Sequence, residues 1–221
     1  MPGARELRPQ VAAASRRLAA AGLVLGTAGN VSARSGDEVA ITPTGAVLAT
    51  LEPDEVTVVA LEDGRVVDGT LAPTSELDLH LGVHRRYDAG AVVHTHAPAA
   101  TALSCVLDGE LPCIHYGLLM LGGSVPVAPY ATFGTPQLAE SVIAALEGKT
   151  AALMANHGAI AYAGDVDAAV EASLLLEWAC DVYARALQAG TPRALDEEQQ
   201  EDVVRAAIER SYGQRQRLEQ E

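Results

Sequence analysis

A strand-like run that ends in two histidines constrains this chain more than any other feature. Residues 91–96 read Ala-Val-Val-His-Thr-His, a short apolar and β-branched segment that is typical of a β-strand. Side chains alternate along a strand, so His94 and His96 are expected on one face with Cα atoms roughly 6–7 Å apart. Two imidazoles at that separation can bind one metal ion, and their neutral nitrogens suit Zn²⁺. A solvent-exposed pair is the alternative.

Further ligands must come from distant segments. The residues after His96 do not match the ligand spacing of a cupin or a metallo-β-lactamase, and the chain contains no His-Glu-x-x-His. Glu76 lies upstream, and His157 follows a second strand-like run; both favour a metal site. A competing set is Glu76, His80 and His84, which share a helix face at i, i+4 and i+8. His84, however, stands in a charged run typical of a solvated surface.

Composition restricts the class of protein. The chain has 221 residues, 49% of them hydrophobic, which predicts one domain over residues 1–221 with a C-terminal helical tail from about residue 196. A net charge of −14 argues against nucleic acid or an anionic membrane as partner. Cys105, Cys113 and Cys180 show no paired spacing, and we find no signal peptide or membrane span. We therefore expect a cytoplasmic protein.

The order of the expected elements predicts a layered α/β/α domain with a mixed, largely antiparallel central sheet. Helical periodicity covers residues 5–21, 75–87, 97–108, 135–146, 165–189 and 196–212, and strands are expected in between. Residues 55–61 and 65–68 flank Glu-Asp-Gly, which indicates a hairpin. Ser75 is expected to cap the second helix.

Three turns of small residues offer uncharged hydrogen-bond donors. They are residues 26–29, 42–45 and 73–75, and their backbone N–H and hydroxyl groups can cradle a phosphate. Ordinary turn and helix-capping chemistry is the alternative for each turn taken alone.

Lys149 is the only lysine in the chain. It stands in Gly-Lys-Thr, but the preceding glycine of a phosphate-binding loop is missing and the tripeptide follows a helix, so we reject that motif. We expect Lys149 at an exposed helix end. A lysine there is unsuited to Schiff-base chemistry, because nothing nearby lowers its pKa.

Taken together, eight segments resemble the class II aldolase/adducin head family, and within it the fuculose-phosphate branch. The matching segments are residues 26–32, 41–45, 74–76, 92–96, 114–116, 129–135, 156–158 and 211–213. Each is weak alone, whereas their order along nearly the whole chain is specific to the superfamily. One departure is visible: Thr74-Ser75 stands where that branch has Ser-Ser.

The resemblance implies roles for particular residues. It makes Glu76, His94, His96 and His157 the ligands of one zinc ion, and Glu76 also the acid/base. Tyr116 and Tyr212 would be catalytic and reach an active site shared with a neighbouring subunit of a homotetramer. Phosphate and substrate binding would fall to the three turns, through Thr27, Gly29, Asn30, Thr44, Gly45, Thr74 and Ser75.

The function implied is zinc-dependent, reversible cleavage of a small phosphorylated sugar, a ketose 1-phosphate. L-fuculose 1-phosphate would give dihydroxyacetone phosphate and L-lactaldehyde. Zinc would serve as the electron sink for the enediolate, Glu76 would shuttle the proton, and Tyr116 would protonate the leaving aldehyde oxygen. A related sugar-phosphate epimerase, dehydratase or decarboxylase stays open. A non-catalytic adducin-type interaction module is expected to lose the ligands that are present here.

Overall fold

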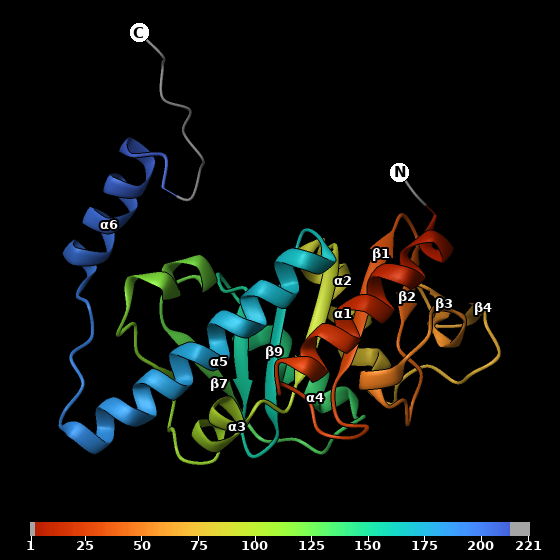
Figure 1. Ribbon diagram of the computed structural model, residues 1–221, viewed down its shortest axis with the longest axis horizontal. Coiled ribbons are helices and arrows are strands. Elements are labelled where there is room, and N and C mark those ends of the chain that lie inside the picture. The colour runs from red at the N-terminus through yellow and green to blue at the C-terminus, as the bar shows by residue number, and fades with distance from the viewer. Residues whose placement is uncertain (1–2, 213–221) are drawn as a thin grey trace, which may run out of the picture.

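The computed structural model describes residues 3–212, and a nine-stranded sheet forms their centre (Figure 1). The strand order is β4-β3-β2-β1-β5-β9-β8-β7-β6. Every described neighbouring pair is antiparallel except β7 with β8. The bounds are β1 Asn30–Ser35, β2 Glu38–Ile41, β3 Thr57–Ala60, β4 Val66–Asp68, β5 Ala91–Thr95, β6 Glu110–Leu111, β7 Val125–Ala128, β8 Ala151–Met154 and β9 Gly158–Ala163. The mixed, largely antiparallel sheet is confirmed.

Helices cover both faces of this sheet, which confirms the three-layer architecture. One face carries α1 (Arg8–Ala20), α3 (Pro98–Ser104) and α5 (Val166–Ala189), and the other carries α2 (Leu77–Tyr87) and α4 (Pro136–Ala145). Short 3₁₀ helices are η1 (Ala4–Leu7), η2 (Leu48–Thr50), η3 (Pro53–Glu55) and η4 (Tyr116–Leu121). The last helix, α6 (Glu197–Glu209), lies beside η4, at the opposite end of the molecule from β4 (Figure 1).

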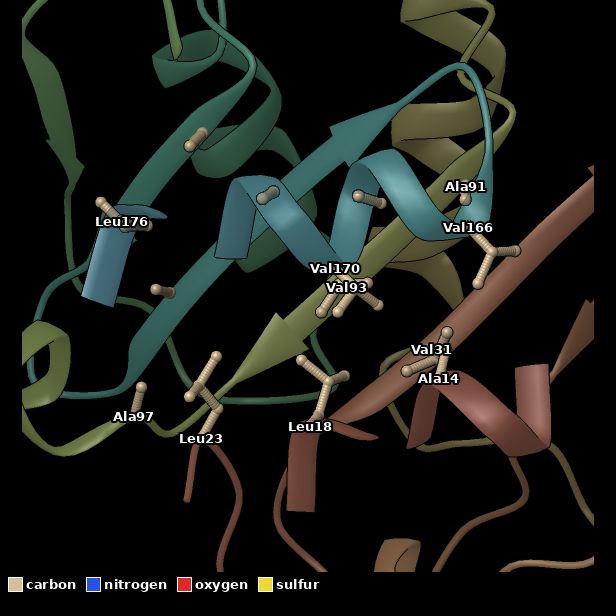
Figure 2. Close-up of a cluster of buried hydrophobic side chains, with 14 of the residues drawn as sticks. Ala14, Leu18, Leu23, Val31, Ala91, Val93, Ala97, Val166, Val170 and Leu176 are labelled. Carbon is tan, nitrogen blue, oxygen red and sulfur yellow. The ribbon is translucent and has the colours of Figure 1, made fainter. Parts of the chain in front are cut away.

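The larger core lies between the sheet and the α1/α3/α5 layer. Figure 2 shows Leu18 of α1 and Val170 of α5 converging on Val31 and Val93 of the central strands. These side chains are fully buried, and each contributes about 1.5–3 kcal/mol by leaving water. The apolar stripe of α1 meets this core, as its helical period predicts.

Strand β5 is buried on both faces, and this decides where its histidines point. Val93 belongs to the α1/α5 core, whereas Val92 packs with Leu79 and Leu138 on the α2/α4 side. Because successive side chains alternate, His94 shares the face of Val92. The histidines therefore face the layer that contains α2.

The start of α2 differs from the expectation. Ser75 does not cap the helix: Glu76 occupies the N-cap position, without a side-chain capping bond. The hydroxyl of Thr74 instead accepts a hydrogen bond from the Glu76 amide, at 3.3 Å. The third expected helix is also shorter than predicted and ends at Ser104. Among the described residues, no helix combines the length and apolarity needed to cross a membrane.

Candidate metal and phosphate site

Three histidines from two neighbouring strands meet at the end of the sheet. His94 is in β5, His96 follows it directly, and His157 lies in the turn between β8 and β9. Their ligand nitrogens all lie within 4.8 Å of one another, and Nε2 of His94 is 2.9 Å from Nε2 of His96. The prediction that His94 and His96 share a face is confirmed, and His157 joins them.

Backbone contacts hold His94 in place. Its Nδ1 donates to the carbonyl of Ala159 in β9, at 2.9 Å, and this leaves Nε2 available as a ligand. Gly158 makes the approach of β9 possible, since a Cβ at this position would stand 2.4 Å from the carbonyl oxygen of Thr95. The turn before it contains Asn156 at φ 55°, a left-handed conformation that asparagine tolerates.

Glu76 closes the cluster from the start of α2. Its Oε2 lies 3.2 Å from Nε2 of His94, and its Oε1 lies 3.5 Å from Nε2 of His157. Asn30 donates from Nδ2 to Oε2, at 2.9 Å. Oε1 is buried and has no hydrogen-bond partner among the described residues. A buried carboxylate oxygen without a partner is costly, and a cation among the histidines would satisfy it.

The electrostatics of this cluster favour metal ligation. Burial, together with the neighbouring His94 and His157, lowers the pKa of His96 to about 4. Burial also lowers the pKa of His157. Burial alone would raise the pKa of Glu76, but His94 and the Asn30 amide outweigh it, so this pKa lies below its usual value. Neutral imidazoles and an ionised carboxylate are the forms that bind a metal.

The competing helical set does not form. His80 and His84 are both fully buried, so the expectation of a solvated His84 is wrong. Their ring nitrogens contact the hydroxyl of Ser32, at 2.7 Å from His80 Nδ1 and 2.8 Å from His84 Nε2. Within residues 3–212, only His94, His96 and His157 form a cluster suited to a metal. Both histidines of α2 therefore contact β1 and are not part of the cluster.

A cavity of about 470 Å³ opens onto Glu76, His96 and His157. All seven residues expected to bind substrate line it: Thr27, Gly29, Asn30, Thr44, Gly45, Thr74 and Ser75. Neither arginine nor lysine is among the lining residues. An anionic substrate would therefore depend on uncharged donors and on a bound cation.

The structure limits which backbone groups are available. The amide of Thr44 donates to Ala72, and that of Thr74 donates to Thr42. These two amides are therefore not free, contrary to the expectation that all three turns offer their N–H groups equally. The amides of Gly29, Gly45 and Ser75 donate to no protein acceptor in the described part of the chain.

Six further residues line the cavity and received no role from the sequence: Ala28, Pro43, Tyr130, Ala131, Phe133 and Asn156. Tyr130, Ala131 and Phe133 follow β7, and Asn156 precedes His157. Tyr130 and Phe133 are each 66% exposed, which is unusual for large aromatic groups. They belong to segments that carried the family resemblance, so the signal was present although no role was drawn from it.

Tyr116 and Tyr212 lie elsewhere. They are exposed, and neither lines the cavity of this chain. Tyr212 is the last described residue, and Gly213, which closes its motif, lies outside the described residues. Lys149 also lies away from the cavity; it is half-buried and donates from Nζ to the carbonyl of Gly122, at 2.7 Å. Lys149 follows the end of α4 as expected, but the expectation that it is exposed is wrong.

Comparison with known proteins agrees with this geometry. Residues 9–184 match the family model described as Class II Aldolase and Adducin N-terminal domain. The chain belongs to this family. Class II aldolases depend on a metal ion, and the three histidines with Glu76 supply a donor set that fits one.

Individual relatives point to the aldolases of the family. A 5-methylthioribulose-1-phosphate/5-deoxyribulose-1-phosphate aldolase of Rhodospirillum rubrum is 40% identical over 207 residues, 92% of each chain. A 5-deoxy-D-ribulose 1-phosphate aldolase of Bacillus thuringiensis serovar kurstaki is 36% identical and covers 94% of this chain and 97% of its own. A solved L-fuculose 1-phosphate aldolase superposes with a TM-score of 0.87, at 32% identity over 92% of this chain and 96% of that one. The chain is a class II aldolase of the fuculose-phosphate aldolase type.

Proposed function

We propose that this protein is a zinc-dependent aldolase that reversibly cleaves a deoxy-ketose 1-phosphate into dihydroxyacetone phosphate and a small aldehyde. The observation that carries the proposal is the unpartnered Oε1 of Glu76, which is buried beside His157 at the floor of a cavity lined by uncharged donors. That combination provides a metal site and an anion site within one cavity.

Glu76, His94, His96 and His157 would hold the ion. Three imidazoles and one carboxylate are a donor set that zinc accepts. When bound, the ion would polarise the ketose carbonyl and stabilise the negative charge left when the carbon–carbon bond breaks. The chain's own part is to orient the substrate and move its protons.

The phosphate group would lie against the three turns. The free amides of Gly29, Gly45 and Ser75, together with the hydroxyls of Thr27 and Thr44, are donors suited to a phosphate. Because the whole chain carries a net charge of −14, these local donors must act against an unfavourable overall field. We therefore expect the phosphate to contribute much of the binding selectivity.

Glu76 is the proposed acid/base. Its lowered pKa keeps it ionised near neutral pH, and it lines the cavity. During cleavage the C4 hydroxyl loses a proton and C3 of the three-carbon fragment gains one, and a carboxylate in this position can deliver the proton to C3 and remove it again in the reverse reaction. Asn30 donates to Oε2, whereas Oε1 has no hydrogen-bond partner among the described residues.

The apolar wall supports a substrate that ends in a methyl or methylthio group. Tyr130, Ala131 and Phe133 line the cavity, and the printed substrates of the relatives, 5-deoxyribulose and 5-methylthioribulose 1-phosphates, both end in such a group. Cleavage between the third and fourth carbons would release acetaldehyde or methylthioacetaldehyde. L-fuculose 1-phosphate is the second candidate, because it also ends in a methyl group and would release L-lactaldehyde.

A panel of ketose 1-phosphates tests the proposal. Release of dihydroxyacetone phosphate is followed by coupling to NADH oxidation, for 5-deoxyribulose, 5-methylthioribulose and L-fuculose 1-phosphates, with ribulose 1-phosphate as the hydroxylated control. We expect the deoxy substrates to exceed the control in kcat/KM by up to about 100-fold, the limit for an apolar pocket that meets one added hydroxyl. No release from any of the four would overturn the proposal.

The same panel separates the sister activities. An epimerase would change the configuration of a pentose phosphate without releasing a three-carbon product, and a dehydratase or decarboxylase would release water or carbon dioxide. Product analysis by NMR distinguishes these outcomes. An adducin-type interaction module would leave every substrate unchanged.

We also propose that the protein acts as a homotetramer whose active sites lie between subunits. The exposed, paired Tyr116 and Tyr212 support this, since they lie outside the cavity of their own chain. Exposed apolar side chains at the same end, Met120 and Ile208, are 79% and 75% accessible and are suited to an interface. Sedimentation of the purified protein tests the oligomeric state.

A further inference from the structure

A buried network of polar contacts runs from the back of Glu76 to the far end of α2. It lies behind the cavity and belongs to none of the roles assigned above, apart from the two residues at its front. It has five contacts and joins six residues: Glu76, Asn30, His80, Ser32, His84 and Ala89.

The front half of the chain holds Asn30 from both sides. Nδ2 of Asn30 donates to Oε2 of Glu76 at 2.9 Å. Oδ1 of the same amide lies 2.5 Å from Nε2 of His80. Asn30 is 6% exposed and His80 is fully buried. The end of the amide that faces His80 therefore cannot exchange its partner for bulk water.

The rear half is anchored on the main chain. Ser32 of β1 bridges His80 and His84, and Nδ1 of His84 lies 2.8 Å from the carbonyl of Ala89. Ser32 and both histidines are fully buried. Three imidazole or hydroxyl groups in a row with no water access form a network that works only if each member is satisfied.

The direction of the rear hydrogen bonds follows from donor chemistry. A carbonyl only accepts, so His84 carries its proton on Nδ1 and presents a bare Nε2. Burial lowers the pKa of His84 to about 4, which keeps its ring neutral. Ser32 therefore donates to His84 and accepts from Nδ1 of His80.

This direction makes two acceptors compete for one amide. His80, with its proton on Nδ1, presents a bare Nε2 to Oδ1 of Asn30, so two acceptors face each other there, while Nδ2 of the same amide donates to the Glu76 carboxylate. Both neighbours require its NH₂ group. The orientation of the amide is thus decided by the imidazoles behind it as well as by the carboxylate in front.

We propose that Ser32, His80 and His84 are positioning residues that set the orientation of the Asn30 amide and, through it, the placement of the Glu76 carboxylate. This inference rests on the proposed function of Glu76 as the acid/base. Partners one step behind a metal site commonly change activity by about 10- to 100-fold when removed. These buried contacts therefore affect the proton-transfer step and do not affect the phosphate-binding turns.

The first test determines the tautomers of the buried histidines directly and needs no variant. Histidine labelled with ¹⁵N reports in NMR which ring nitrogen carries the proton in the zinc-loaded wild-type protein. We expect His80 and His84 both to be Nδ1–H tautomers. An Nε2–H tautomer at His84, or at His80, overturns the proposed direction of the chain whatever reaction the enzyme catalyses.

The second test measures catalysis in Ser32→Ala. The kcat for cleavage should fall about 10- to 100-fold, and deuterium exchange into dihydroxyacetone phosphate, which needs only the acid/base step, should fall in parallel. KM and the zinc content should stay near wild type, because the substrate donors and ligands remain. If Ser32 had only a structural role, the substitution would instead lower the folded fraction or raise KM.

Two matched controls isolate the network. Ser15→Ala removes another fully buried hydroxyl, which bonds to Val11 inside α1, and should leave kcat unchanged. His80→Gln keeps an amide near the position of Nε2, whereas His80→Leu removes every donor and acceptor. The glutamine variant should therefore retain more activity than the leucine variant.

The outcomes separate this inference from the proposed function. Folded, zinc-loaded Ser32→Ala and His80→Leu proteins with kcat and exchange within about twofold of wild type, a change below about 0.4 kcal/mol, overturn the positioning role. If Ser32→Ala fails to fold, the wild-type tautomers still decide. If the wild-type enzyme neither cleaves any ketose 1-phosphate nor exchanges protons of dihydroxyacetone phosphate, the proposed function fails instead.

Discussion

The hydroxyl groups of Tyr116 and Tyr212 lie 3.3 Å apart at the surface, although 96 positions separate them in the chain. Their rings pack edge to face, with centroids 6.2 Å apart. The hydrogen bond with Tyr212 raises the pKa of Tyr116, so Tyr116 stays protonated near neutral pH. Within the described residues, neither phenol lines the cavity of its own chain.

Subunit mixing tests whether they serve a neighbouring chain. Tyr116→Phe and Glu76→Ala should each be nearly inactive as pure oligomers. Hybrids made by unfolding and refolding a mixture should regain part of the activity, because some cavities then receive both an intact Glu76 and an intact Tyr116. The coupled assay for dihydroxyacetone phosphate measures the recovery. Hybrids as inactive as their parents would contradict a shared site.

Removal of one histidine should remove the metal. His96→Ala takes one of three imidazoles from a cluster whose nitrogens lie within 4.8 Å, and the loss of a ligand weakens a zinc site severely. We expect elemental analysis after gel filtration to show one zinc per wild-type chain and little in the variant. His84→Gln is the control and should keep its zinc. The reverse pattern would favour the helical set.

Acid should destabilise the metal-free protein through its buried histidines. The pKa values of His80 and His84, about 3 and about 4, lie below the ordinary 6.5. Below pH 6.5 the unfolded chain therefore binds protons at these residues that the folded chain does not bind. Stability is therefore full above pH 6.5 and is lost as the pH falls toward 4. Each histidine contributes a slope of up to about 1.4 kcal/mol per pH unit in that window.

Urea unfolding of the metal-free protein at pH 7, 6 and 5 measures this slope. His84→Gln has one fewer buried titratable ring, and its free energy of unfolding should depend less steeply on pH. Equal slopes for the variant and the wild type would show that His84 does not take part.

Lys149 should be dispensable for the chemistry. It is the only lysine, it donates to Gly122 and Ser124, and it does not line the cavity. Lys149→Arg keeps a donor for the Gly122 carbonyl, so near-normal kcat is expected. Borohydride added with substrate should leave the enzyme active, whereas a strong chelator should abolish turnover and added Zn²⁺ should restore it. Mass spectrometry that finds reduced substrate attached to Lys149 would contradict the metal-dependent mechanism.

Much of the fold and of the metal cluster could be predicted from local patterns. The period of two in residues 91–96 places His94 and His96 on one face, and the helical period of α1 and α5 identifies the stripes that pack on the sheet. The ordered segments around Glu76 and His157 identify the family. These features depend on neighbours within one element, where spacing in sequence and spacing in space are related by simple geometry.

Other properties depended on the tertiary structure alone. The charged run around His84 indicates a solvated surface, yet β1 brings Ser32 against its ring, from 52 positions away. Likewise, the Thr44 amide donates to the carbonyl of Ala72, whereas the amides of Gly29, Gly45 and Ser75 have no protein acceptor among the described residues. A hydrogen-bond partner from a distant segment is set by how strands and helices pack, and no local period records it. The clustering of His94, His96 and His157 was thus predictable from the sequence, whereas the buried contacts behind Glu76 were decided by the packing of α2 on β1.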